Sequence, residues 1–173
     1  MEWNQNFYDQ MIQKLDQFTR KYYINKLIRG TIYFVGISTA LFILFNLLES
    51  QFYFSKSIRK GFVFAFIGIS GWSLWKFIFT PLLHYFRLGK LISHEEAAKI
   101  IGTHFSDVKD KLLNVLQLKN QLVSYSDRSL VEASINQKAA ELKPVPFIAA
   151  IDFNKNRRQL RYALIPLSLL MGI

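Results

Sequence analysis

The stretch "GTIYFVGISTALFILFNLL", residues 30–48, decides the fold class of this chain of 173 residues. It contains no charged side chain, and its length is close to the roughly 20 apolar residues that an α-helix needs to cross a bilayer. The polar and aromatic segment before it is too long for the basic start of a signal peptide, and no cleavage-site pattern follows it. We therefore predict a retained membrane-spanning helix.

A second apolar run, residues 61–86, predicts another membrane-spanning helix that returns across the bilayer. The two runs are separated by residues 49–60, a short polar and aromatic connection that we expect to form an external hairpin. Pro81 lies near the end of the second run. A proline there removes one helical hydrogen bond and is expected to kink or loosen the last turns.

Small side chains on both runs predict the surface where the two helices meet. Glycine and alanine let helical backbones approach closely, and in membranes such positions are enriched at helix–helix interfaces. We expect an antiparallel packing seam formed by Gly36 and Ala40 of the first run and by Ala65, Gly68 and Gly71 of the second.

Lys76 is a charged residue inside the second run. A charge within a span suggests a functional role, such as a pair with a partner's carboxylate or a position facing an ion path. The alternative is structural. If the span ends near Leu82 or Leu83, the lysine lies about 9–10 Å below that end, and its side chain can snorkel to the headgroups. Neither run contains an acid, which disfavours an ion path.

Residues 1–29 carry one apolar helical stripe whose members are three or four residues apart. The opposite face is polar, so we predict an amphipathic helix on the cytoplasmic side. The stripe either packs on the rest of this protein or on a partner, or it lies on the membrane surface. Its members are Trp3, Phe7, Met11, Leu15, Phe18 and Tyr22.

Residues 87–161 change to a polar composition and predict a small cytoplasmic helical segment. A capping box at residues 93–96 should open a helix that ends near Gly102. A second helix is expected to begin at Ser106 or Asp107.

A third helix of this segment is expected from a capping box at residues 129–132 to about Leu142. Pro144 and Pro146 then interrupt the chain. Because the apolar content of the segment is modest, we expect it to lean on the membrane base or on a partner.

The chain closes with three arginines and an apolar run at residues 162–173. The run is shorter than a full span. We interpret it as the start of a truncated third span that leaves the cytoplasm, with the arginines at the inner face. Pro166 is expected to kink this run without stopping it.

Basic residues near the spans predict the orientation, because they tend to stay on the cytoplasmic side. The connection at residues 49–60 holds three, and the flanks on the other side hold more. We therefore predict a multi-pass protein of a bacterial inner membrane with a cytoplasmic N-terminus. The residues expected to anchor at inner-face headgroups are Arg20, Lys21, Lys26, Arg29, Arg157, Arg158 and Arg161.

The sequence carries no catalytic or cofactor motif. It has no Cys, and His84, His94 and His104 match no metal-ligand spacing. Glu95 and Glu96 lie side by side, where a helix N-terminus favours acids. Phosphate-binding, dinucleotide and nucleophile-elbow motifs are missing, so we predict a non-enzyme with no metal, cofactor or small-molecule substrate. Topology explains the net charge of +10, so nucleic acid is not an expected partner.

The stretch "LISHEEAAKIIGTHFSDVKDKLLNVLQL", residues 91–118, resembles a recurring segment of a family of large, poorly characterised inner-membrane proteins of Gram-negative bacteria. The resemblance implies a domain of unknown function with a few N-terminal spans, a third span that leads to a long extracytoplasmic helical region, and work with other envelope proteins. Some family members resemble partners of ring-forming ATPases. No catalytic residues carry over. The shared positions are Ile92 to Ala98, Ile101-Gly102, Phe105, Asp110 to Asn114 and Leu116 to Leu118.

These patterns predict an all-α membrane protein, with a transmembrane helical hairpin, a small cytoplasmic helical segment and the start of a third span. We expect this membrane-anchoring region to act as a structural or scaffold subunit of an envelope complex. Its partners would be the lipid bilayer and other membrane or envelope protein subunits. The alternative is a component of a transporter or channel, with Lys76 facing the path.

Overall fold

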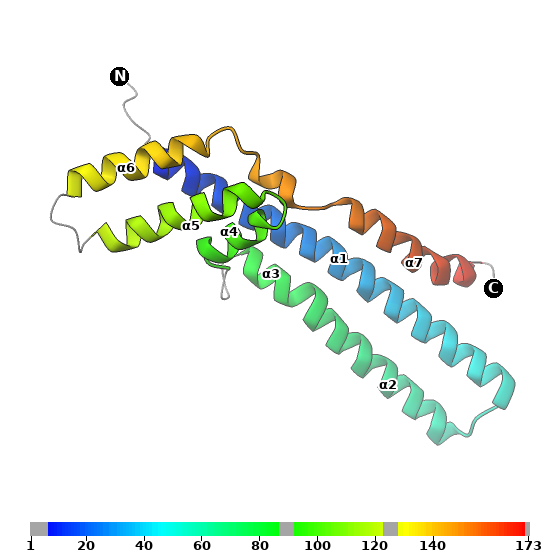
Figure 1. Cartoon of the computed structure of the whole chain (residues 1–173). Helices are drawn as coiled ribbons and strands as arrows, with labels where there is room; N and C mark the ends of the chain where they lie inside the picture. The colour runs from blue at the N-terminus through cyan, green and yellow to red at the C-terminus, as the bar shows by residue number, and fades with distance from the viewer. Residues whose placement is uncertain (1–6, 87–91, 123–127, 172–173) are drawn as a thin grey trace. The chain divides into compact units, whose positions relative to one another are not determined.

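The computed structural model describes residues 7–86, 92–122 and 128–171, and within these ranges it is helical with no strand, as predicted (Figure 1). The elements are α1 (Phe7–Phe52), α2 (Lys56–Leu74), the π-helix η1 (Trp75–Phe79), α3 (Thr80–Tyr85), α4 (His94–Gly102), α5 (Ser106–Gln121), α6 (Arg128–Glu141), the 3-10 helix η3 (Phe147–Ala150) and α7 (Asn154–Met171).

The chain divides into two compact units, and α1 contributes to both. Unit 1 comprises Met1–Tyr22 and Lys90–Ile151, and unit 2 comprises Tyr23–Gly89 and Asp152–Ile173. The sequence predicted separate segments at residues 1–29 and 30–48, whereas the structure has one continuous helix of 46 residues. No proline or capping pattern separates the two stretches. A single glycine at position 30 costs only about 1 kcal/mol in a helix interior.

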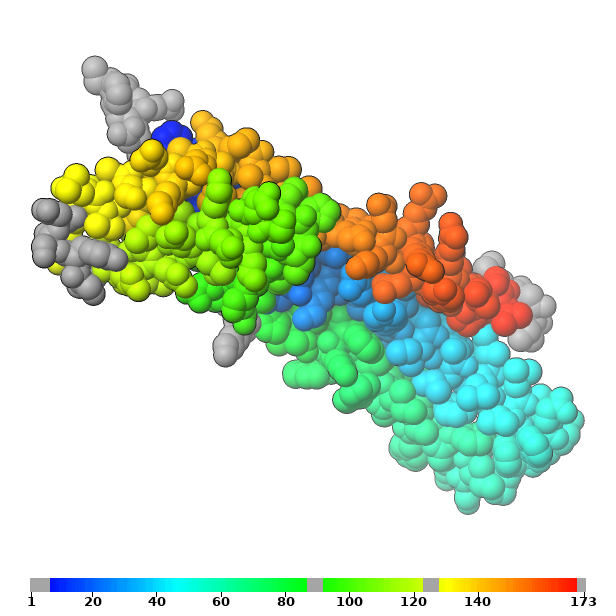
Figure 2. All heavy atoms as spheres, viewed as in Figure 1, coloured from blue at the N-terminus to red at the C-terminus, as the bar shows by residue number. Residues whose placement is uncertain are grey.

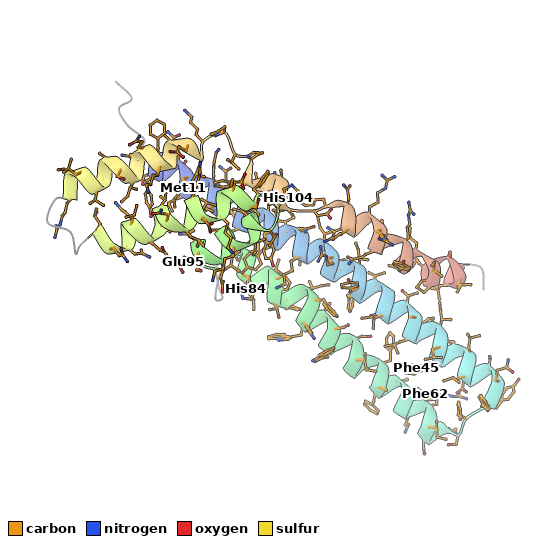
Figure 3. All side chains as sticks on the ribbon, viewed as in Figure 1. Met11, Phe45, Phe62, His84, Glu95 and His104 are labelled. Carbon is orange, nitrogen blue, oxygen red and sulfur yellow. The ribbon has the colours of Figure 1, made fainter. Side chains whose placement is uncertain are left out.

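Unit 1 is built around the apolar stripe at the start of α1. Met11, Leu15 and Phe18 are at most 2% exposed and belong to one hydrophobic core. Met11 is labelled in Figure 3. Most of the predicted stripe therefore packs on this protein itself, with Tyr22 partly buried against the core, whereas Phe7 is exposed. Trp3 lies outside the described residues. The other buried members of the core come from α4, α5, α6, η3 and the residues around them: Ala97, Ala98, Ile101, Leu112, Val115, Leu116, Ile135, Ala139, Leu142, Phe147 and Ile151.

The helix boundaries in unit 1 follow local capping chemistry. Ser93 Oγ accepts the Glu96 amide N–H over 3.1 Å, and the Glu96 carboxylate accepts the Ser93 amide N–H over 3.2 Å, which confirms the capping box. The predicted start of α5 at Ser106 is also confirmed. The second capping box is wrong, because Ser129 already lies inside α6, which includes Arg128.

The start of α1 is tied to α6 through its backbone. The first amide groups of a helix lack an intrahelical acceptor, and the Tyr8 N–H donates to Asn136 Oδ1 over 3.4 Å. The Lys119 ammonium lies 5.2 Å from the centre of the Tyr8 ring. Burial, and secondarily the negative charge of Asp9, raise the pKa of the Tyr8 hydroxyl above its ordinary value of 10.0.

In unit 2, the later part of α1 pairs with α2, η1 and α3 in the antiparallel direction. As the residue number increases along α1, the number of the contacting residue on the second helix decreases. Figure 3 shows one such pair, Phe45 facing Phe62. The contacting pairs are Tyr23 with His84, Tyr33 with Phe77, Ser38 with Ser70, Phe42 with Phe66, Phe45 with Phe62, and Glu49 with Arg59.

Among the glycines of these helices, Gly30 makes the closest approach to the neighbouring helix, and the predicted seam did not include this position. A Cβ atom there would overlap the carbonyl oxygen of Phe77 and lie 2.8 Å from its carbonyl carbon. Pro81, four residues after Phe77, has no N–H to offer that carbonyl. The π-helix Trp75–Phe79 ends two residues before this proline. The predicted loosening near Pro81 is therefore one widened turn, and the helix continues to Tyr85.

The predicted seam is wrong for the second helix. Ala65, Gly68 and Gly71 are exposed, and a Cβ atom at Gly68 or Gly71 would meet nothing within 4 Å. The reason is rotational: the phenylalanine pairs and Ser70 occupy the face of α2 that meets α1, so the small residues point elsewhere. The connection is also tighter than residues 49–60, because only Tyr53, Phe54 and Ser55 separate α1 from α2.

Gly30→Ala should destabilise unit 2, whereas Gly68→Ala should not. The added methyl group at position 30 collides with rigid backbone, and overpacking of this kind costs about 1–3 kcal/mol. At position 68 the alanine meets open space and gains helix propensity of roughly 1 kcal/mol. Thermal unfolding of the two variants in detergent micelles measures the difference, and equal midpoints would contradict the close approach.

Tyr8 should make the stability of unit 1 fall at alkaline pH. Its folded pKa lies above the unfolded value, so its contribution is fully present below pH 10.0 and is lost as the pH rises through the folded pKa. Urea unfolding in detergent between about pH 9 and about pH 11 should show a steeper fall for the wild type than for Tyr8→Phe. Parallel curves for the two proteins would contradict the shifted pKa.

Candidate functional site

The largest feature of unit 2 is its exposed apolar surface. Two helical stretches, Phe7–Phe52 and Lys56–Tyr85, are long and apolar enough to cross a membrane. The most apolar 18 residues of the first stretch are 0% buried, and those of the second are 6% buried. The core helix of a soluble protein would be mostly buried by the rest of the chain. Side chains of α1 and α2, in cyan and green, form an open surface in Figure 2.

Unit 1 contrasts with this surface. Among its described residues, the large apolar side chains that are exposed are Phe7 and Leu130. Unit 2 exposes many more, including Phe64 at 73%, Trp72 at 60% and Trp75 at 61%. Contiguous apolar surface on this scale marks contact with a membrane or another protein.

Polar side chains join α1 to α7. Asn25 and Asn156 are 7% and 6% exposed, and the Asn156 amide nitrogen donates to Asn25 Oδ1. Arg29 Nε donates to Asn156 Oδ1 over 3.4 Å, and Gln159 Nε2 donates to the Tyr33 hydroxyl over 2.7 Å. These contacts advance along both helices in the same order, so α7 lies parallel to α1 (Figure 1).

Beyond these hydrogen bonds, α1 and α7 enclose an open groove of about 600 Å³, called here the α7 groove. Gly36 faces Ala163, and a Cβ atom at Gly36 would lie 3.5 Å from Ala163 Cβ. The part of the predicted seam on α1, Gly36 and Ala40, therefore lies beside α7. Residues lining the groove include Tyr33, Gly36, Ala40, Gln159, Ala163 and Pro166.

A second open groove, of about 300 Å³, lies between α1 and α2 next to the turn that joins them. One end is polar, where the Arg59 guanidinium donates to Glu49 Oε1. The rest is apolar. This hairpin groove is lined by residues that include Phe42, Asn46, Glu49, Arg59, Val63 and Phe66.

Each groove contains one buried side-chain oxygen without a hydrogen-bond partner among the described residues. These atoms are Gln159 Oε1 in the α7 groove and Glu49 Oε2 in the hairpin groove. Buried acceptors are nearly always satisfied in folded proteins. Within the described part of unit 2, each groove therefore offers a hydrogen-bond acceptor to a ligand or partner.

Lys76 is exposed, and its ammonium lies over aromatic rings rather than beside a carboxylate. The Nζ atom is 4.7 Å from the centre of the Trp72 ring and 5.8 Å from that of Phe77. Trp72 precedes Lys76 by one helical turn, so the side chain points away from the nearer helix end at Tyr85. A cation over an indole face is attracted by its quadrupole, typically by about 0.5–2 kcal/mol.

The predicted headgroup anchors divide between the units. Arg20 and Lys21 are exposed in unit 1, and Lys26 is exposed in unit 2. Arg29 bonds Asn156 and is partly buried. The three arginines at positions 157, 158 and 161 are exposed on α7.

Helix α7 is longer than the predicted run at residues 162–173. It begins at Asn154, where Asp152 Oδ1 accepts the amide N–H of Asn154 over 3.0 Å and that of Lys155 over 3.3 Å. A carboxylate at a helix start satisfies free amides and complements the helix dipole. Pro166 lies inside the helix and does not end it.

The histidines have separate local partners. The His84 ring stacks on Tyr23 with centres 5.2 Å apart, His94 Nε2 lies 3.1 Å from Asp16 Oδ1, and the His104 ring contacts Phe105. Within the described residues, no three His, Asp or Glu side chains converge as a metal site would require.

Comparison of the chain with protein-family models, with curated proteins and with solved structures finds no match. The geometry of unit 2 therefore carries the functional argument. The sequence reading missed Asn25, Asn156 and Gln159, because isolated amides at the edge of an apolar run have no motif. The available signal was helical spacing: Asn25, Arg29 and Tyr33 are four residues apart on α1, and Asn156 and Gln159 are three residues apart on α7.

A disulfide should form between Gly36→Cys and Ala163→Cys without disturbing the fold. The Cβ separation of 3.5 Å at these positions matches disulfide geometry, and the native chain has no Cys to compete. The matched control pairs Gly68→Cys with Ala163→Cys, because position 68 faces open space. Peptide mass spectrometry after mild oxidation should find the crosslink in the first variant only; equal crosslinking would contradict the α1–α7 contact.

Proposed function

We propose that this chain anchors a multi-pass protein in a bacterial inner membrane and acts as a structural or scaffold subunit of an envelope complex. The observation that carries the proposal is the exposed apolar surface of α1 and α2 in unit 2, in contrast to unit 1, where most apolar side chains are enclosed in a core. Water would penalise the first surface by roughly 25 cal/mol per Å² of apolar area, and a bilayer removes that cost.

The pairing of the two long helices supports a specific depth in the bilayer. Residues 30–48 of α1 span about 27 Å, close to the ~30 Å hydrocarbon thickness. Gly30 lies beside Phe77, and Glu49 lies beside Arg59. The matching part of the second helix is therefore about residues 60–77, shorter than the run at residues 61–86 that hydropathy alone suggested.

This register supports an interfacial role for Lys76. One residue before Phe77, it lies level with Arg29 and Gly30, at the edge of the proposed hydrocarbon slab. Its backbone lies at the interfacial level, and its ammonium turns inward onto the Trp72 ring, where the indole face stabilises the charge. The same placement weakens the transporter alternative, because a lysine on a path would be needed at the membrane centre.

Helix α7 supports a third crossing that starts at the same level. Asn156 bonds Arg29, and Ala163 lies beside Gly36, so Arg157 and Arg158 share the level of Arg29. Basic residues on all three helices thus lie near one plane, where anionic lipid headgroups would meet them. The apolar residues after Arg161 would begin the third span.

Charge also supports a cytoplasmic N-terminus. The turn end carries Lys56, Arg59 and Lys60, and Arg59 is paired with Glu49. The opposite end carries the larger set of basic residues described above, and that set is expected on the cytoplasmic side. Gly68 and Gly71 remain open on α2, where a partner's helix would find room for close approach.

The topology can be tested with single cysteines in this naturally cysteine-free chain. Ser55→Cys, in the turn, should react with a membrane-impermeant maleimide on intact spheroplasts. Asn114→Cys, exposed on α5, should react only after permeabilisation. The protein should also stay in membranes washed at alkaline pH. Release by the wash would contradict membrane insertion, and labelling at 114 without permeabilisation would reverse the orientation.

A further inference from the structure

We propose that the hairpin groove binds one glycerophospholipid, with its phosphate at Arg59 and an acyl chain along the apolar wall. This inference rests on the proposed membrane insertion of unit 2 and adds a defined lipid site to it. The groove has the polarity of such a ligand: Asn46, Glu49 and Arg59 lie at one end, and phenylalanine and valine side chains line the rest.

The direction of the groove matches the direction of a lipid in a bilayer. Its polar end lies where Glu49 pairs with Arg59, next to the turn that joins the helices. Its apolar end lies where Phe42 contacts Phe66, with ring centres 6.4 Å apart. These two levels are seven residues apart on each helix, about 10 Å at 1.5 Å per residue. A headgroup at the interface would therefore continue into an acyl chain that descends along the groove.

The charge at the polar end selects a phosphate. Arg59 has five N–H donors, and one of them donates to Glu49 Oε1. Its side chain is 60% exposed, so the remaining donors face outward. Lys56 and Lys60 lie within one helical turn, and Glu49 is the carboxylate that lines the groove. The local surplus of positive charge favours a phosphodiester, and most strongly one with an uncharged headgroup such as glycerol.

Other occupants fit the same observations less well. A second copy of this chain would bring an identical basic turn against Arg59, and like charges repel. Free phosphate would use the polar end and leave the phenylalanine and valine wall exposed. A phospholipid covers both parts of the groove.

The test uses native mass spectrometry of the full chain, purified in detergent and titrated with palmitoyl-oleoyl phosphatidylglycerol. Arg59→Gln and Glu49→Gln both break the same ion pair, so they share any effect on the fold. Arg59→Gln should weaken lipid retention about tenfold, as expected for one charge-assisted hydrogen bond. Glu49→Gln should retain the lipid at least as well as the wild type, because it frees the guanidinium. Equal loss in both variants would overturn the proposal.

The apolar wall is tested separately. Val63→Trp should fill the groove and reduce retention, whereas Ile67→Trp, on an exposed position of the same helix that does not line the groove, should not. Glycerol 3-phosphate should compete poorly, since it lacks acyl chains. Competition equal to that of the lipid would show a free-phosphate site and overturn the proposal. A dimer of the chain that binds no lipid would also overturn it. A protein that resists the alkaline wash but shows no such selectivity would refute the lipid site alone.

Discussion

The second helix can lie against α1 because residue 30 has no side chain. The Phe77 carbonyl occupies the space that a Cβ atom would need, and it does so just before a proline that offers no N–H to it. The Cα–H group of Gly30 faces that oxygen, a weak but recurrent contact between helices. At the other end, Glu49 and Arg59 close the pair with an ion pair. These two contacts set the register, and the aromatic pairs between them follow from it.

Helix α7 is held by a different kind of contact. Its hydrogen-bond partners on α1 are the Asn25 amide, the Arg29 guanidinium and the Tyr33 hydroxyl. Asn25 and Asn156 are almost fully buried. Hydrogen bonds between helices are directional, and a buried amide that loses its partner costs about 1–3 kcal/mol. Polar contacts therefore specify the parallel pairing and register of α7, while its exposed leucines and isoleucine are left for the surroundings.

Composition and periodicity predicted the helical class, most of the α1 stripe that packs in the core of unit 1, the boundaries of α4 and the start of α5. Each of these depends on local signals: a 3.6-residue period, a capping box, or a run of apolar residues. The continuity of α1 was missed because hydropathy changes at Gly30 while helix propensity does not. The seam was misplaced because a glycine permits close approach without determining which face is used. That choice depends on rotation of α2, which Phe62, Phe66 and Ser70 set by packing.

The end of the second span illustrates the same limit and shows how structure overcomes it. Hydropathy extends the run to residue 86, because Phe79, Leu82 and Leu83 are as apolar as true membrane residues. Pairing with α1 allows the polar residues of the two helices to be compared at the same level. Where Arg29 ends the apolar run of α1, the neighbouring helix carries Lys76, and beyond it His84 stacks on Tyr23. In the proposed membrane placement, both helices would meet the headgroups at this level, and the last turns of the second helix would lie on the aqueous side.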